Sequence, residues 1–66
     1  MLPLNDKEQA IIELVCKGKS NKDVAAIMGI STPVVACYLR VIYPKLDAHN
    51  RAEACANFVK RKIGAP

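Results

Sequence analysis

The spacing of the apolar residues most limits what this chain can fold into. They recur three and four positions apart in stretches of roughly a dozen residues, and Asn, Ser, Gly and Pro separate these stretches. This is the period of an amphipathic helix, and no run alternates apolar and polar residues as a half-buried strand does. The sequence therefore predicts an all-α fold, and its 66 residues suffice for one small core.

Capping residues indicate the boundaries of four short helices. A side-chain oxygen that can accept a hydrogen bond from the first helical turn precedes each apolar stretch. These capping residues are Asn5, Ser20, Ser31 and Asn50. Gly18 and Gly29 end the first two helices, because glycine adopts the left-handed conformation without a steric penalty. The fourth helix is predicted to run to about Lys62.

The third helix has one clear inner face. The apolar side chains that share it are Val35, Leu39, Ile42 and Leu46. Pro33 falls in the first turn, where its missing N–H removes no helical hydrogen bond. Pro44 falls near the other end, where it deletes a donor and disfavours helical geometry in the residue before it. We therefore expect this helix to kink or to stop near Ile42 or Tyr43.

Charge and cysteine content narrow the class of function. Ten Lys and Arg against six Asp and Glu give a net charge of +4, which suits a polyanionic partner. Cys16, Cys37 and Cys55 have no CxxC spacing and no metal-ligand spacing with His49, so we predict free thiols, no metal site and no cofactor. The sequence has no Ser-His or Cys-His neighbourhood, no glycine-rich phosphate loop and no carboxylate pair with a plausible pocket. We therefore predict that the protein is not an enzyme. No apolar run reaches the roughly 18 residues of a membrane span, so we expect a soluble cytoplasmic domain with no membrane partner.

Two of the predicted helices are separated only by Gly29, Ile30 and Ser31, which is the spacing of a helix-turn-helix. Further segments on both sides of this turn follow, in order and without a gap, the pattern of a known family. They are Leu4-Asn5-Asp6-Lys7-Glu8, Ser20-Asn21-Lys22-Asp23-Val24-Ala25, Ile42-Tyr43-Pro44-Lys45-Leu46 and Asn50-Arg51-Ala52-Glu53-Ala54. On these segments the chain resembles the LuxR-type (GerE-like) helix-turn-helix domain from Leu4 to about Val59.

The resemblance implies one domain over residues 1–66, with an ordered core of about residues 4–62, a tri-helical helix-turn-helix and a further C-terminal helix. In this family the third helix enters the major groove of double-stranded DNA, the fourth often supplies a two-fold dimer contact, and the module usually ends a longer transcriptional regulator. We therefore expect a DNA-binding homodimer in the bacterial cytoplasm, associated with the nucleoid when it is bound to DNA.

Positions that match the family's motif imply the DNA contacts. Ser20, Asn21 and Lys22 match the start of the second helix, where backbone amides and the lysine could bind a phosphate, and Lys45 matches a further backbone contact. A solvated side chain is the alternative role for both lysines. The outward arc of the third helix adds the other candidates, which are Val34, Ala36, Cys37 and Arg40.

The third helix departs from the family's usual sequence. Val34 and Ala36 replace a threonine and a lysine, and Tyr38 replaces a histidine, so two polar DNA contacts are missing. Arg40 can donate two hydrogen bonds to a guanine edge, and its alternative role is a phosphate contact or a pair with a nearby acid. The apolar residues could contact thymine methyl groups, but they add little electrostatic attraction.

The fourth helix presents a strip of small apolar side chains to a second copy of the chain. The expected dimer contacts are Ala52, Cys55, Ala56 and Val59. A disulfide through Cys55 that links the two copies is an alternative form of this contact. Glu8 and Arg51 both match the family, and we expect them to pair between the first and fourth helices.

A protein-interaction role is the alternative function. The outward apolar side chains of the third helix could form a docking face on a degenerate helix-turn-helix. Such a domain would pair with a related regulator and block its DNA contact. Binding to random duplex DNA at low salt separates the two hypotheses.

Overall fold

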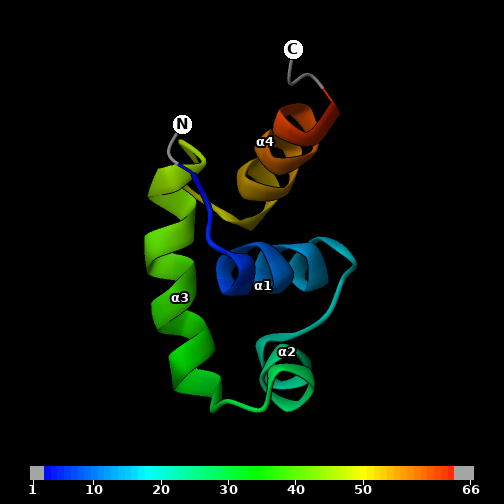
Figure 1. Ribbon diagram of the computed structural model, residues 1–66, viewed down its shortest axis with the longest axis vertical. Helices are drawn as coiled ribbons and strands as arrows, with labels where there is room; N and C mark the ends of the chain where they lie inside the picture. Colours follow the sequence, from blue (N-terminus) through cyan, green and yellow to red (C-terminus); the bar gives the residue numbers. More distant parts are fainter. Residues whose placement is uncertain (1–2, 64–66) are drawn as a thin grey trace.

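A computed structural model describes residues 3–63, and this part of the chain contains four α-helices and no strand. The helices are α1 (Asp6–Cys16), α2 (Asn21–Met28), α3 (Thr32–Lys45) and α4 (Arg51–Ile63). Figure 1 shows α1 at the centre, with α3 beside it, α2 below and α4 above. The all-α prediction is confirmed. The ends of the predicted domain, residues 1–2 and 64–66, lie outside the described residues.

The predicted capping residues all stand at helix starts, but they do not all cap with their side chains. Asn5 and Glu8 form a complete capping box on α1, and Asn50 accepts a 2.9 Å hydrogen bond from the backbone N–H of Glu53. The Ser20 hydroxyl accepts a hydrogen bond from the backbone N–H of Asp23. Ser31 accepts no such bond, so its predicted side-chain cap is wrong. Pro33 has no N–H, and the N–H groups of the next two residues already donate to the Ser31 carbonyl at 3.1 Å.

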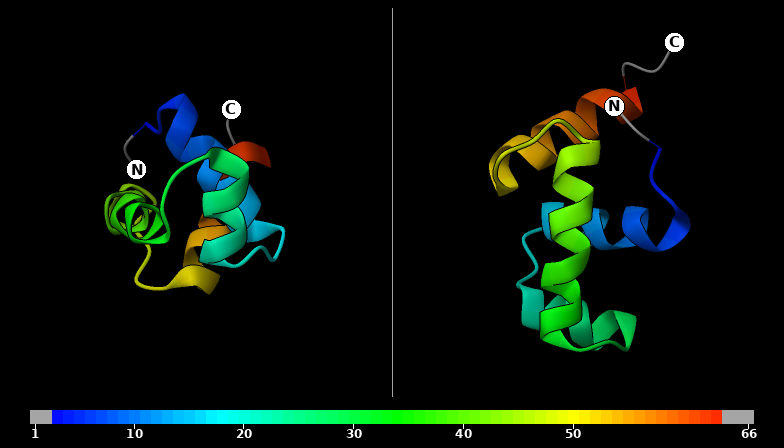
Figure 2. Two further views of the ribbon diagram at one scale, coloured as in Figure 1. Left: turned by 90° about the horizontal axis from the view of Figure 1, so that it is seen from below. Right: turned by 90° about the vertical axis from the view of Figure 1, so that its left-hand side faces the viewer.

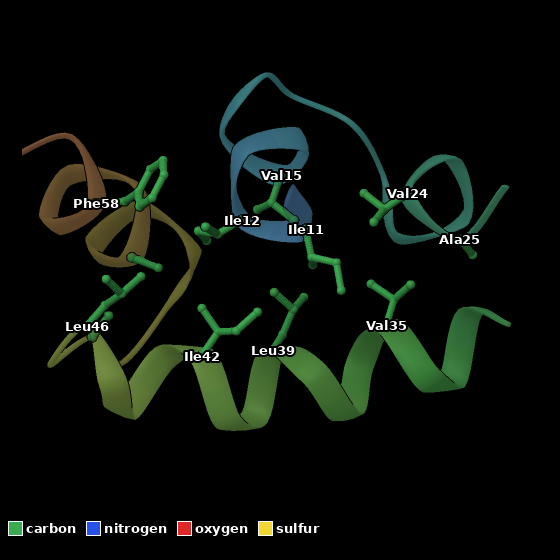
Figure 3. Close-up of a cluster of buried hydrophobic side chains, with 12 residues drawn as sticks. Ile11, Ile12, Val15, Val24, Ala25, Val35, Leu39, Ile42, Leu46 and Phe58 are labelled. Atoms are coloured by element: carbon green, nitrogen blue, oxygen red, sulfur yellow. The ribbon is translucent and has the colours of Figure 1, made fainter. Parts of the chain in front are cut away.

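The core fills the space between α1 and the other helices, as Figure 3 shows. The predicted inner face of α3 is confirmed, since all of its members are buried. The largest fully buried side chains are Ile11, Ile12, Val15, Val24, Val35, Ile42 and Leu46. α1 therefore supplies the centre of the core through Ile11, Ile12 and Val15.

Pro44 does not stop α3 near Ile42 or Tyr43, so the prediction that the helix ends there is wrong. The helix continues to Lys45, one residue beyond the proline. A proline so close to the end removes a single helical donor, and the following turn supplies other donors to the last carbonyls. Leu46 donates to the Ile42 carbonyl at 3.1 Å, and Ala48 donates to the Tyr43 carbonyl at 2.9 Å.

α4 is attached mainly to α1. Cys16 of α1 and Cys55 of α4 form a disulfide, and their Cα atoms are 5.3 Å apart. The prediction of free thiols is therefore wrong for these two residues, while Cys37 is free and exposed. The expected Glu8–Arg51 pair is also wrong, because Arg51 donates instead to the backbone carbonyls of Val15 and Lys19. These contacts attach the start of α4 to the end of α1.

The views in Figure 2 place α3 on one side of the molecule, with α1, α2 and α4 on the other. One long side of α3 is therefore buried and the opposite side is open. No single helix in the described part of the chain is long and apolar enough to cross a membrane. α2 and α3 pass that test together on length and composition, but they are bent by 103° relative to each other.

Candidate nucleic-acid interface

α2 and α3 form the helix-turn-helix that the spacing predicts. The angle of 103° between them lies in the range of DNA-binding helix-turn-helix motifs. Gly29 ends α2 with φ of 70°, a left-handed conformation that glycine adopts without strain. The backbone N–H of Ile30 then donates to the Ala25 carbonyl at 3.0 Å and closes the turn. This turn sets the direction of α3 relative to α2.

The candidate phosphate contacts lie at the start of α2. Lys22 is exposed in the first turn of α2. Its charge and the positive end of the helix dipole both attract an anion such as a phosphate. Asn21 is half-buried, and the exposed Ser20 accepts a hydrogen bond from the backbone N–H of Asp23 at 3.1 Å. The fold therefore brings the three predicted residues together, and Lys22 is the one with a free cationic group there.

The outward face of α3 carries one cation and several apolar side chains. Arg40 is exposed, as the sequence analysis requires of a residue that reads base edges. Val34 and Cys37 are exposed too, whereas Ala36 is half-buried. Val41 is 49% exposed, so the apolar surface extends one residue past Arg40. The face can offer one strong bidentate donor and a broad apolar contact.

A shallow hollow lies beside this face, with a volume of about 240 Å³. Its lining is mostly apolar and consists of Glu8, Val34, Cys37, Tyr38 and Val41. We call this surface the α3 hollow. It joins the flank of α3 to the start of α1, and sequence reasoning did not identify it because it depends on how the two helices pack.

Lys45 lies in an ion pair rather than on the open face. Its ammonium donates to both oxygens of the Glu8 carboxylate, at 2.8 and 3.0 Å. Glu8 is only 4% exposed, and it also accepts a 3.0 Å hydrogen bond from the backbone N–H of Asn5. Lys45 thus ties the end of α3 to the start of α1. One signal in the sequence could have indicated this role: Glu8 precedes Ile11 and Ile12 by three and four positions and so shares their inner face.

The ion pair changes the acidity of Glu8. The hydrogen bonds from the Lys45 ammonium, followed by the one from the Asn5 backbone N–H, hold the pKa of the Glu8 carboxyl below its ordinary value. Partial removal from water opposes this shift but does not reverse it. The carboxylate is therefore favoured in its ionised form when the domain is folded.

Acid should destabilise the domain through Glu8. Its pKa is lower in the folded than in the unfolded chain, so the folded state binds fewer protons. The stabilisation is present above the unfolded pKa of about 4.3 and is lost as the pH falls through the folded pKa. Urea denaturation at neutral pH and at about pH 3 should show a larger loss for the wild type than for Glu8→Gln. Equal losses would mean that the pair does not contribute to acid sensitivity.

Only part of the dimer strip predicted on α4 is exposed. Ala52, Ala56 and Val59 are exposed and can meet a second copy. Cys55 is half-buried and bonded to Cys16, so it does not belong to the exposed strip. The alternative of a disulfide between two copies through Cys55 is contradicted, because that sulfur is already paired within the chain.

No group of three or more His, Cys, Asp and Glu residues within the described range could hold a metal ion. His49 lies next to Glu53, whose carboxylate accepts a 2.8 Å hydrogen bond from the His49 backbone N–H. That bond, followed by the one to the ring nitrogen, lowers the pKa of the Glu53 carboxyl. This contact reinforces the start of α4.

Comparisons with known proteins agree with this geometry. The family described as bacterial regulatory proteins, luxR family, matches residues 2–58. The chain is 40% identical over 52 residues to the transcriptional regulatory protein DesR of Bacillus subtilis, covering 79% of this chain and 26% of DesR. It is 39% identical over 62 residues to the HTH-type transcriptional activator RamA of Corynebacterium glutamicum, covering 94% of this chain and 21% of RamA.

A third relative is the nitrate/nitrite response regulator protein homolog of Haemophilus influenzae, 33% identical over 58 residues, or 88% of this chain and 28% of that protein. The chain spans about a quarter of the length of these relatives. No solved structure gives a significant match. These relatives are named as regulators, and the family is one of regulatory proteins rather than enzymes, in agreement with the prediction from the sequence. On the family match and the helix-turn-helix, the chain belongs to the LuxR family of bacterial regulatory proteins and is a DNA-binding domain of that family.

Proposed function

We propose that the domain serves a transcriptional regulator in the bacterial cytoplasm and binds duplex DNA as a dimer. The outward face of α3 enters the major groove, and the exposed strip of α4 joins two copies over half-sites about 34 Å apart. Arg40 reads a base edge, and Lys22 holds a phosphate together with Lys19, an exposed lysine just before α2. Lys45 has a smaller part in DNA binding than the family pattern implies, because its ammonium is used by Glu8.

The observation that carries the proposal is the exposure of Lys22 and Arg40 on the two helices of the motif. The core side of α3 faces α1, so the cationic side is the side that is open to a polyanion. In support of this proposal, the relatives DesR and RamA are named as a transcriptional regulatory protein and an HTH-type transcriptional activator.

A salt titration with a generic DNA duplex tests the proposal. Each phosphate that the protein neutralises releases counterions, so the logarithm of the affinity should fall with the logarithm of salt concentration by about 0.9 per contact. Lys22→Ala should reduce this slope by about 1 per subunit. Arg40→Lys should keep most of the slope but lose preference for a selected site, because lysine cannot form the bidentate contact to guanine.

Lys60→Ala is the matched control for this titration. It removes the same charge from an exposed position on α4, at the end of the molecule opposite α2 (Figure 1). Its slope should equal that of the wild type. Affinity that does not change with salt, or an equal effect of the two lysine variants, would contradict the proposed contact surface.

The α3 hollow favours a second candidate, in which α3 docks a related regulator protein. Contiguous apolar surface on a small domain is typical of a protein contact. In that case the domain would show almost no affinity for random duplex at low salt. The same titration therefore separates the two functions.

A further inference from the structure

We infer that Cys16 and Cys55 are a reversible redox site, where a low-molecular-weight disulfide oxidises the two thiols and so fastens α4 to α1. The two residues are 39 positions apart in the sequence, and the fold brings their Cα atoms to 5.3 Å, a separation that a disulfide spans without moving the backbone. Both side chains are half-buried rather than enclosed, so a small reagent can reach them. Nothing in the DNA-binding role requires this pair.

The compartment makes reversibility the expected behaviour. A protein that binds bacterial DNA works in a reducing cytosol, where disulfides are rare and those that form are usually transient and redox-sensing. This step rests on the proposed function, since it takes the compartment from DNA binding. The oxidation state of Cys16 and Cys55 therefore follows the ratio of thiols to disulfides in the surrounding solution.

α4 is the element that this pair controls. It packs mainly on α1, through the buried Ala54 and Phe58. Its other attachments include the hydrogen bond from Arg51 to the Val15 carbonyl at 3.0 Å and the hydrogen bond from Asn57 to the Leu46 carbonyl at 2.7 Å. The disulfide is the one covalent attachment among them, so its loss weakens the docking of α4 before that of the other helices.

The helix-turn-helix is independent of the redox site. α2 and α3 pack on each other and on α1, and no cysteine bond involves either helix. The exposed strip of α4, Ala52, Ala56 and Val59, is the proposed contact between two copies. Oxidation therefore fixes the dimer surface in position, and reduction loosens that surface while it leaves the DNA-reading face folded.

The chemistry is two thiol–disulfide exchanges. One cysteine thiolate attacks a sulfur of glutathione disulfide, forms a mixed disulfide and releases one glutathione thiolate. The second cysteine thiolate then attacks the protein sulfur of the mixed disulfide and releases the second glutathione. The two protein thiols lose two electrons and two protons in total, and one glutathione disulfide becomes two glutathione molecules.

Hydrogen exchange in glutathione buffers tests the inference. The measurements use the Cys37→Ser background, because Cys37 is a free, exposed thiol that could join the exchange. As the ratio of reduced to oxidised glutathione rises, we expect the Cys16–Cys55 bond to open. The lower global stability should speed exchange in every helix, and amides of α4 should become about a further tenfold or more faster relative to amides of α2 and α3. Cys16→Ser in the same background should show the fast α4 rates in every buffer.

Two results would overturn the inference. The bond could remain closed in a large excess of reduced glutathione, which would make it a permanent staple. Alternatively, protection could fall equally in all helices, which would mean that the bond supports the whole fold and not α4. Neither readout requires DNA, so a failure of duplex binding would count against the proposed function while these exchange rates still decide on the redox site.

Discussion

Reduction of the Cys16–Cys55 disulfide is expected to lower the free energy of unfolding by about 4 kcal/mol. The bond closes a loop with a sequence separation of 39 residues, and in the chain-entropy account such a loop removes much of the freedom of the unfolded chain. A domain of 66 residues has a total stability of about 3–10 kcal/mol. The reduced domain should therefore unfold at a much lower urea concentration, as measured by circular dichroism with and without a reductant.

The other cysteine provides the control for this measurement. Cys37→Ser should lose as much stability on reduction as the wild type, because Cys37 is not bonded. Cys55→Ser should start at the lower stability and should not respond to the reductant. A wild-type midpoint that is the same in both conditions would show that the two cysteines are not bonded in solution.

Lys45→Ala is expected to cost about 3 kcal/mol of folding stability, because it leaves the Glu8 carboxylate buried without its cation. Lys45 contributes hydrogen bonds of 2.8 and 3.0 Å to that carboxylate. The remaining partner of Glu8 is the Asn5 backbone N–H, which also belongs to the capping box of α1. Urea denaturation at neutral pH measures this loss.

Lys22→Ala is the matched control, since it removes the same ammonium from an exposed position and should change stability by less than about 0.5 kcal/mol. The order of the two variants should be reversed in DNA binding, where Lys22→Ala should change the salt slope more than Lys45→Ala does. Equal losses of stability would mean that the Glu8–Lys45 pair does not support the fold. If Lys45→Ala changed the salt slope of DNA binding more than Lys22→Ala did, Lys45 would belong to the DNA-contact surface.

The fold could be predicted from the sequence because its signals are local. The four apolar side chains of the α3 inner face are separated by three and four positions, and all are buried as expected. The caps at Asn5 and Asn50 could be predicted because a capping hydrogen bond spans only three residues. The effect of Pro44 could not be predicted in the same way, because it depends on the turn after the helix, where Leu46 and Ala48 donate to the carbonyls of Ile42 and Tyr43.

The site could be predicted only in part, because long-range contacts decide which side chains are free. Arg40 and Lys22 are exposed, as their positions on the helices suggested. Lys45 lies on the same motif but meets Glu8, which is 37 residues away in the sequence. Cys55 falls next to the exposed strip by helical period, yet it bonds to Cys16. The pattern within α1 indicates that Glu8 faces inward but not that it meets Lys45, and no pattern within α4 indicates the partner of Cys55.

The most direct test of the account is a chemical-shift titration of the chain with a generic DNA duplex at low salt. The amides of Lys22, Cys37 and Arg40 should shift most, because they belong to the open face of the helix-turn-helix. The amides of α4 should shift little at a stoichiometry of one copy per duplex. A spectrum that does not change, or shifts confined to α1 and α4, would contradict the assignment of α2 and α3 as the DNA-binding surface.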